Sequence, residues 1–172
     1  MTLPNFRFGR AMLSSVHKNY HLKPENIMSY SRVDQLPLLT DQLDGQLSRL
    51  FRKALQECGI WQDLEEEGPF TVFVPADQAM ENVGGVSFHE LSPGALKQLV
   101  SCHIVRGRFL SRDLMEKEAL EALNGQLLRV ELANGKIRIN ESRVLFKNTE
   151  ARNGVIHYIY PAILPDEWGG RQ

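Results

Sequence analysis

One stretch constrains the fold of this chain more than any other: the run QLLRVELANGKIRIN at residues 126–140. An Asn-Gly pair flanked by alternating apolar and polar residues is a strong signal for a β-hairpin with a two-residue turn. With Asn134 and Gly135 as the turn, three cross-strand pairs form: Leu132 with Ile137, Val130 with Ile139, and Glu131 with Arg138. A slip of one residue would turn the apolar side chains to the opposite face, so the sequence predicts both the hairpin and its register.

Three further runs predict strands. Residues 70–74 are apolar on both faces, as in a central strand covered on each side, and Pro75 ends the run by removing a backbone donor. Asp77 is then expected to accept backbone N–H bonds and to open the next helix. The runs RVLFKN, at residues 143–148, and GVIHYIY, at residues 154–160, complete the predicted sheet.

Helical periodicity separates these strands. Residues 36–46 indicate a short helix, and residues 47–61 indicate a longer one with its apolar positions on one face and Ser48 as its cap. Residues 91–100 indicate another helix, with Ser92 at the cap position. Because helices precede most strands, the predicted class is α+β, with a mainly antiparallel sheet packed against helices.

A second Asn-Gly pair precedes the last apolar run, in ARNGVIHYIYPAILP at residues 151–165. Gly154 is expected to adopt a positive φ at a tight turn, and the strand that follows is expected to be covered on both faces. His157 in that strand is interpreted as a core residue whose two ring nitrogens are satisfied by hydrogen bonds. Asp77, Gly154 and His157 are therefore predicted to stabilise the fold.

Composition limits the classes of function. The chain has 172 residues and a net charge of −1, whereas nucleic-acid-binding domains are usually basic. Its two cysteines, Cys58 and Cys102, are too few for a disulfide framework and are predicted to be unpaired. No apolar run is long enough to span a membrane, and the N-terminus lacks the apolar region of a secretory signal. Without a nucleophile elbow, phosphate loop or metal motif, neither a cofactor, a bound metal nor enzymatic activity is expected.

Residues 1–35 are interpreted as a basic N-terminal extension, since their first part carries basic but no acidic side chains. A transit peptide, a surface-binding arm or chance would each explain this asymmetry. His17 and His21 would share one face of a helix, but a solvated pair is favoured over a metal site because no acid or third ligand accompanies them. A domain at residues 36–165 and a C-terminal tail at residues 166–172 follow.

Four sequence blocks occur in the order and at the separations typical of one family: GPFTVFVPADQAM, LKQLVSCHIVRGRFL, LNGQLLRVEL and NGVIHYIYPAILP. Over residues 36–165 the chain thereby resembles the fasciclin domain. The resemblance implies a compact α+β fold, a β-wedge with helices packed on its flank. It also implies a non-enzymatic adhesion or protein-interaction module that binds a protein partner at the cell surface or in the extracellular matrix, with an intracellular or organellar location as the alternative.

Departures from the family pattern bear on the partner. Cell-binding members carry a Tyr-His pair where this chain has Cys102 and His103, and several carry an Asp-Ile pair where it has Asn148 and Thr149. Both changes remove groups associated with integrin recognition, so an integrin is not the favoured partner. These four residues are nevertheless the partner-binding positions to which the resemblance points, and Arg152 is added to them as a surface residue. For His103 a buried, hydrogen-bonding role is favoured, because adjacent side chains in an extended segment point to opposite faces.

A second hypothesis also comes from the resemblance. Some fasciclin-like proteins bind carotenoids or other apolar molecules, so this chain could carry an apolar small ligand such as a carotenoid or a lipid. Met80, Phe88 and Phe146 would line such a site, or they would belong to the core. Colour or extractable lipid in the purified protein would distinguish the carrier from the interaction module.

Overall fold

The computed structural model describes residues 32–43 and 45–169 and divides the chain into two units, Met1–Leu36 and Pro37–Gln172. Of the first unit, residues 32–36 are described, and they begin with a helical turn. The His17 and His21 pair and the basic residues Arg7, Arg10, Lys18 and Lys23 of the predicted extension lie outside the described residues. The fold presented below is that of the second unit.

The helices of the second unit are short. They are α3 (Leu39–Gln42), α4 (Arg49–Glu57), α5 (Ile60–Glu66), α6 (Asp77–Met80), α7 (Pro93–Ser101), α8 (Ser111–Leu114) and α9 (Asp166–Gly169), with 3₁₀ turns at Gln46–Ser48 and Phe88–Glu90. The single helix predicted at residues 47–61 is two helices, because Gly59 adopts a left-handed φ of 81° between α4 and α5. Helix α7 begins as predicted, with the Ser92 hydroxyl accepting a hydrogen bond from the Ala95 N–H.

Helix α4 is capped by a side chain that is distant in sequence. Ser48 precedes the helix, but its hydroxyl donates to the carbonyl of Leu43 instead of accepting a helical N–H. The carboxylate of Asp77 accepts the backbone N–H of Leu50 at 2.9 Å and the Nε–H of Arg49 at 3.0 Å. Asp77 therefore begins α6 as predicted, while its carboxylate serves the first turn of α4 and not its own helix.

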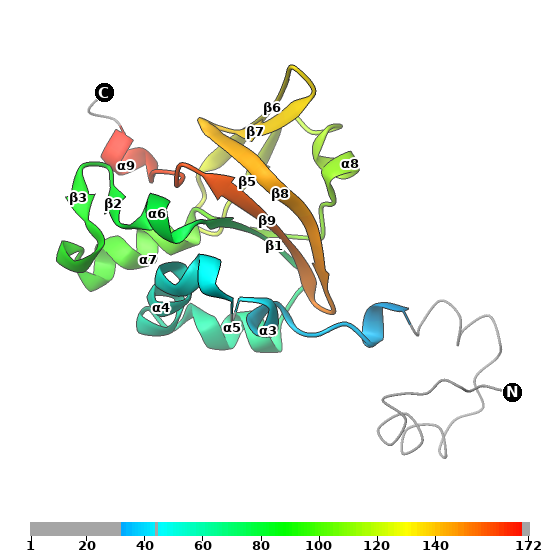
Figure 1. Cartoon of the computed structure of the whole chain (residues 1–172), viewed down its shortest axis with the longest axis horizontal. Coiled ribbons are helices and arrows are strands. Elements are labelled where there is room, and N and C mark those ends of the chain that lie inside the picture. The colour runs from blue at the N-terminus through cyan, green and yellow to red at the C-terminus, as the bar shows by residue number, and fades with distance from the viewer. Residues whose placement is uncertain (1–31, 44, 170–172) are drawn as a thin grey trace, which may run out of the picture. The chain divides into compact units, whose positions relative to one another are not determined.

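The strands form one large sheet and one small two-stranded sheet (Figure 1). Their bounds are β1 (Phe70–Pro75), β2 (Asn82–Val83), β3 (Val86–Ser87), β4 (Ile104–Arg106), β5 (Ala119–Glu121), β6 (Leu127–Ala133), β7 (Lys136–Ile139), β8 (Ser142–Ala151) and β9 (Gly154–Tyr160). The order in the large sheet is β4-β1-β9-β8-β7-β6-β5, and all neighbours are antiparallel except β1 and β9. An isolated bridge between Val105 and Ala122 brings the two ends of this sheet together. The fold is thus α+β with a mainly antiparallel sheet, as predicted.

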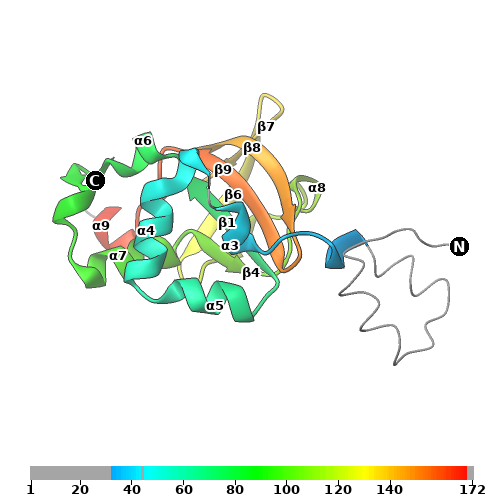
Figure 2. The ribbon, with the colours of Figure 1, turned by 60° about the horizontal axis from the view of Figure 1, so that its bottom comes forward.

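Two apolar clusters fill the fold, one on each face of the large sheet. Val72 and Val74 of β1 pack with the helices, including Phe51 of α4. Phe73 of the same strand points the other way and packs with Ile159 inside the curled sheet. Figure 2 shows α4 and α5 on one side of β1 and β9, and α8 on the other. Every residue of β1 is buried, which confirms the predicted central strand.

The predicted hairpin of β6 and β7 is confirmed in its turn and in its register. Leu132 pairs with Ile137, Val130 with Ile139, and Glu131 with Arg138. Asn134 and Gly135 form the turn, and both have positive φ, at 54° and 75°.

The turn between β8 and β9 differs from its prediction. Its two residues are Arg152 and Asn153, because Ala151 already pairs with Gly154 across the hairpin. Gly154 does not have a positive φ. Glycine is needed there for another reason: a Cβ atom at this position would overlap the carbonyl oxygen of Phe70 on β1.

Candidate functional site

The predicted partner-binding residues occupy two separate places in the fold. Cys102 and His103 follow the end of α7, and both are fully buried. A buried side chain cannot contact a partner, so the assignment of these two residues to a binding surface is wrong, and the buried role favoured for His103 is the one that agrees with the structure. Asn148, Thr149 and Arg152 lie instead at the end of the β8–β9 hairpin, where Asn148 and Arg152 are exposed.

His103 connects α7 to the segment that follows β9. Its Nδ1 donates to the carbonyl of Leu99 at 2.7 Å, and its Nε2 accepts the backbone N–H of Ile163 at 2.9 Å. The neighbouring Cys102 thiol lies 3.5 Å from the Ile163 carbonyl. Burial lowers the pKa of His103 to about 4 and raises the pKa of the Cys102 thiol, so both remain uncharged at neutral pH. These groups stabilise the junction and are closed to solvent.

His157 plays a comparable part beneath the β8–β9 hairpin. The fully buried ring lies 5.7 Å from that of Phe73, in a stacked arrangement. Its Nε2 donates to the carbonyl of Phe109 at 2.8 Å, and its Nδ1 accepts the backbone N–H of Asn148 at 3.2 Å. Burial is the main cause that lowers the pKa of His157, so the neutral ring satisfies both hydrogen bonds. This geometry favours the predicted structural role.

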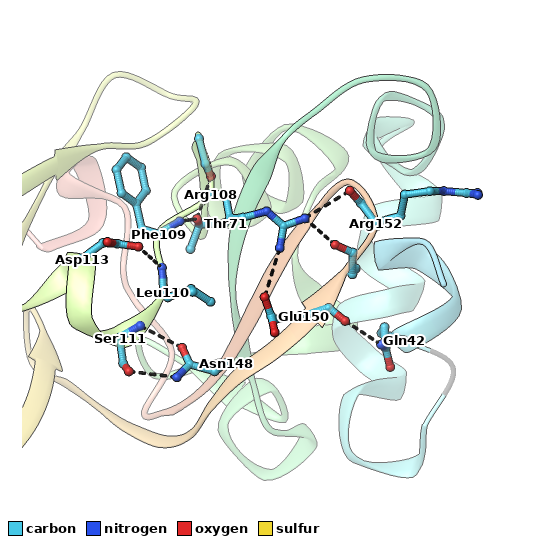
Figure 3. Close-up of polar contacts among 12 residues, drawn as sticks. Gln42, Thr71, Arg108, Phe109, Leu110, Ser111, Asp113, Asn148, Glu150 and Arg152 are labelled. Carbon is cyan, nitrogen blue, oxygen red and sulfur yellow. Dashed lines mark hydrogen bonds and ion pairs between the residues drawn. The ribbon is translucent and has the colours of Figure 1, made fainter. Parts of the chain in front are cut away.

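Asn148 forms a bulge that departs from the regular strand. It has a left-handed φ of 62°, and the register between β8 and β9 shifts between Phe146 and Thr149. The side-chain amide is turned toward α8, where it accepts the Ser111 N–H at 2.8 Å and donates to the Ser111 hydroxyl at 2.9 Å (Figure 3). Asparagine tolerates this φ better than most residues, and its amide fixes the bulge to the adjoining loop.

The tip of the hairpin is held from two sides. Arg108 donates from Nη2 to the carbonyls of Ala151 and Arg152, and its Nη1 lies 3.7 Å from the Glu150 carboxylate. From α3, the side chain of Gln42 donates to the Glu150 carbonyl at 3.0 Å. The Arg152 side chain, in contrast, points away from this network (Figure 3). The tip is therefore a rigid support for exposed side chains.

Exposed apolar side chains gather on the same hairpin. The exposed fraction is 44% for Leu145, 61% for Phe146 and 37% for Tyr160. Among the described residues, Phe146 and Tyr160 are the two aromatic members of the set of large exposed hydrophobic side chains. Phe146 pairs across the strands with the half-buried Tyr158, whose ring centroid lies 6.4 Å from its own.

We use the term hairpin surface for these side chains and their charged neighbours: Arg143, Leu145, Phe146, Lys147, Arg152 and Tyr160. This set of residues was not predicted from the sequence. A signal was present in RVLFKN, where three apolar residues follow one another although a strand with one buried face can bury only alternate side chains.

The residues proposed to line an apolar ligand site do not come together. Met80 and Phe88 are buried in the helix-side core, whereas Phe146 is on the surface. A groove of about 540 Å³ does exist beside α6. None of these three residues lines it; its walls come from Ala79 and from residues 82–84, 140–142 and 161–166.

Within the described residues, no group of three or more His, Cys, Asp or Glu side chains could hold a metal ion. No described helix is long and apolar enough to cross a membrane. Both cysteines are free thiols.

Relatives of the chain come from several organisms. Protein sll1483 of Synechocystis sp. is 29% identical over 116 residues, which are 65% of this chain and 64% of that protein. Human Stabilin-1 is 36% identical over 110 residues, 62% of this chain but 4% of Stabilin-1. A Plasmodium falciparum protein named Heme ligase is 27% identical over 125 residues, 59% of this chain and 61% of its own length. The chain thus spans less than two thirds of the length of each of these relatives.

A solved structure and a family model agree with the fold described above. The structure of a FAS1 domain pair from the insect cell adhesion molecule Fasciclin I matches with a TM-score of 0.60 at 19% identity, over 77% of this chain and 52% of that one. This likeness shows a shared fold. Residues 46–165 match the family model described as Fasciclin domain. The chain therefore belongs to the fasciclin domain family.

Proposed function

We propose that this fasciclin domain is a non-enzymatic protein-interaction module that binds a protein partner, at a cell surface or in the matrix, through its hairpin surface. The observation that carries the proposal is Phe146, an aromatic side chain of β8 that is 61% exposed. Exposed aromatic residues beside arginine are typical of the central contacts of protein interfaces. The Fasciclin I structure, which comes from a cell adhesion molecule, supports adhesion as the context.

The support beneath the surface favours binding over catalysis. His157 and Arg108 hold the hairpin through hydrogen bonds to backbone groups, so little conformational entropy is lost when a partner docks. The ring nitrogens of His103 and His157 are all bonded to the backbone within the core, so neither ring can exchange a proton with a bound substrate. No geometry in the described part of the chain brings Met80, Phe88 and Phe146 to one ligand, so a carrier function is not proposed.

Cell attachment tests the proposal directly. Surfaces would be coated with equal amounts of the wild-type protein, the Phe146→Ser variant and the Leu132→Ser variant. Leu132 is 57% exposed on β6 and serves as a matched apolar control away from the hairpin. We expect attachment to the wild type and to Leu132→Ser, and loss of attachment with Phe146→Ser. Equal attachment to all three proteins, or none to the wild type, would refute the proposed surface.

The name Heme ligase on one relative requires a separate check. Absorbance titration of the purified protein with hemin would show whether a heme complex forms. We expect free hemin spectra throughout, and a stoichiometric complex in which the bound hemin is then converted to a product would overturn the non-enzymatic assignment.

A further inference from the structure

The exposed charges of the hairpin are of one sign. Arg143, Lys147 and Arg152 are all exposed. Between Ser142 and Tyr160 the sequence contains a single acidic residue, Glu150, and its carboxylate lies beside Arg108. Because the whole chain carries a net charge of −1, this local excess of positive charge is a property of the hairpin and not of the protein.

The cations follow the strand on which the apolar side chains lie. Arg143 and Lys147 flank Leu145 and Phe146 in the sequence, and Arg143 is the cross-strand partner of Tyr160. At about 3.3 Å per residue, the three cationic positions span roughly 30 Å along β8 and its turn. Positive charge therefore lies on both sides of Phe146 along the strand.

Part of the outer edge of β8, between Arg143 and the Glu150 carbonyl that Gln42 of α3 covers, has no strand beside it. Strand β7 pairs with β8 at Ser142 and Arg143, and beyond Arg143 no strand pairs with that edge within the described residues. The register shifts on both sides of Phe146 interrupt the pairing of β8 with β9. Bulges of this kind bend a strand and protect an exposed sheet edge from pairing with another chain. Side-chain contacts must therefore provide most of the recognition.

A second copy of this chain is a poor occupant. An antiparallel pairing of two β8 strands about Leu145 would place Arg143 of each copy opposite Lys147 of the other. Like charges directly opposite one another destabilise a strand pair. Charge complementarity instead favours a partner that carries negative charge.

We propose that the hairpin surface binds an extended acidic segment of a partner protein. Carboxylates of the segment contact Arg143, Lys147 and Arg152, and an apolar side chain between them packs on Phe146 and Tyr160. This inference rests on the proposed function and adds to it the chemistry of the partner. Contacts between carboxylates and exposed cations speed association, and added salt weakens these contacts.

Labelled peptides test the inference. One peptide carries three glutamates at the sequence spacing of Arg143, Lys147 and Arg152, with a phenylalanine beside the middle glutamate, and its match carries glutamine at the three positions. Fluorescence anisotropy should show that the acidic peptide binds the wild type at least about tenfold more tightly than the glutamine peptide at low salt, a preference that falls as salt approaches 0.15 M.

Charge reversal locates the site. The affinity for the acidic peptide should fall by about tenfold or more in the triple variant Arg143→Glu, Lys147→Glu and Arg152→Glu. The control variant Lys97→Glu, Arg129→Glu and Lys136→Glu changes the net charge equally at exposed positions outside the hairpin and should retain binding. Equal binding of the two peptides, or equal losses in the two triple variants, would overturn the inference.

Two further probes separate other polyanions from an acidic protein segment. A DNA duplex and phosphatidylserine vesicles would be titrated under the same conditions. We expect both probes to bind weakly, with an equal loss in the two triple variants. If either probe binds more tightly than the acidic peptide and the hairpin charge reversal abolishes that binding, the cations recognise phosphate and the inference is overturned. If the hairpin reversal preserves cell attachment while Phe146→Ser abolishes it, the acidic partner is refuted and the proposed function stands.

Discussion

Strands β8 and β9 belong to one hairpin but differ in their burial and in the strands that lie beside them. β9 is buried along nearly its whole length, whereas β8 is exposed from Leu145 to Asn148. The cause is their neighbours: β9 lies between β1 and β8, while β8 has a strand beside its outer edge only as far as Arg143. The difference indicates that β9 is constrained by the core and that β8 is free to carry side chains for a partner.

The largest expected effect comes from the buried strand. Gly154→Ala would place a Cβ against the carbonyl of Phe70 and would force β1 and β9 apart. We expect a loss of about 3 kcal/mol or more in the free energy of unfolding, at the upper end for overpacked cores. Urea denaturation measures it.

Gly94→Ala is the matched control for that substitution. Gly94 lies in the first turn of α7 without a positive φ, and nothing lies within 4 Å of the added Cβ. This variant should be as stable as the wild type or slightly more stable. Equal melting of the two alanine variants would show that β9 is not held as tightly against β1 as the structure indicates.

Acid should weaken the core that β9 helps to form. His103 has a pKa of about 4 in the folded state, against 6.5 for an ordinary histidine, and the pKa of His157 is lowered in the same direction. Above pH 6.5 the folded and unfolded forms are both neutral. As the pH is lowered from 6.5 to 4, the unfolded form gains a proton at residue 103 that the folded form does not. The free energy of unfolding therefore decreases by about 3 kcal/mol over this range. Below pH 4 both forms are protonated at this residue, and its contribution no longer changes.

Urea midpoints at pH 7 and pH 5 would measure most of this fall above the range in which ordinary carboxylates titrate. The variant His103→Gln cannot titrate at this position, so it should start less stable and lose less on acidification. A wild-type midpoint that is unchanged from pH 7 to pH 5 would contradict the buried neutral histidine.

The next prediction concerns His157, which connects β9 to β8. His157→Ala removes the partners of the Asn148 N–H and the Phe109 carbonyl and leaves space beside Phe73. We expect a loss of about 2 kcal/mol in the free energy of unfolding, because two polar groups lose their hydrogen bonds. Partner binding should also weaken, since the bulge at Asn148 loses its support from β9. Full binding in a destabilised His157→Ala protein would show that the hairpin surface does not depend on that support.

The sequence was sufficient where local chemistry decides the structure. The hairpin of β6 and β7 follows from period-two alternation and an Asn-Gly turn, and the burial of β1 follows from apolar residues on both faces. Asp77 shows the limit of local signals. A carboxylate at a helix start predicts a cap, but the helix that receives it is α4, which only the tertiary structure brings within reach.

The candidate site was less predictable than the fold. Family position suggested binding roles for both Cys102-His103 and Asn148-Thr149. A buried role was favoured for His103, but the sequence does not reveal that this pair lies beneath the segment containing Ile163. Gly154 was correctly predicted to require glycine, but the predicted reason, a positive φ, was wrong. The actual reason is the close approach of β1, which residues near Gly154 in the sequence do not indicate. The exposure of Phe146 depends on which edge of β8 lacks a neighbour, and that is a property of the sheet order.

The smallest expected effect on stability is at the residue with the largest proposed effect on binding. Phe146 is 61% exposed and touches the fold mainly through the edge-to-face contact with Tyr158, so Phe146→Ser should change the free energy of unfolding by no more than about 0.5 kcal/mol. Leu132→Ser, at a comparably exposed position, should behave in the same way. Urea denaturation of the two variants decides whether the loss of attachment expected for Phe146→Ser is a surface effect. If Phe146→Ser destabilises the protein as much as His157→Ala, then β8 is constrained by the core as β9 is, and the division of roles between the two strands fails.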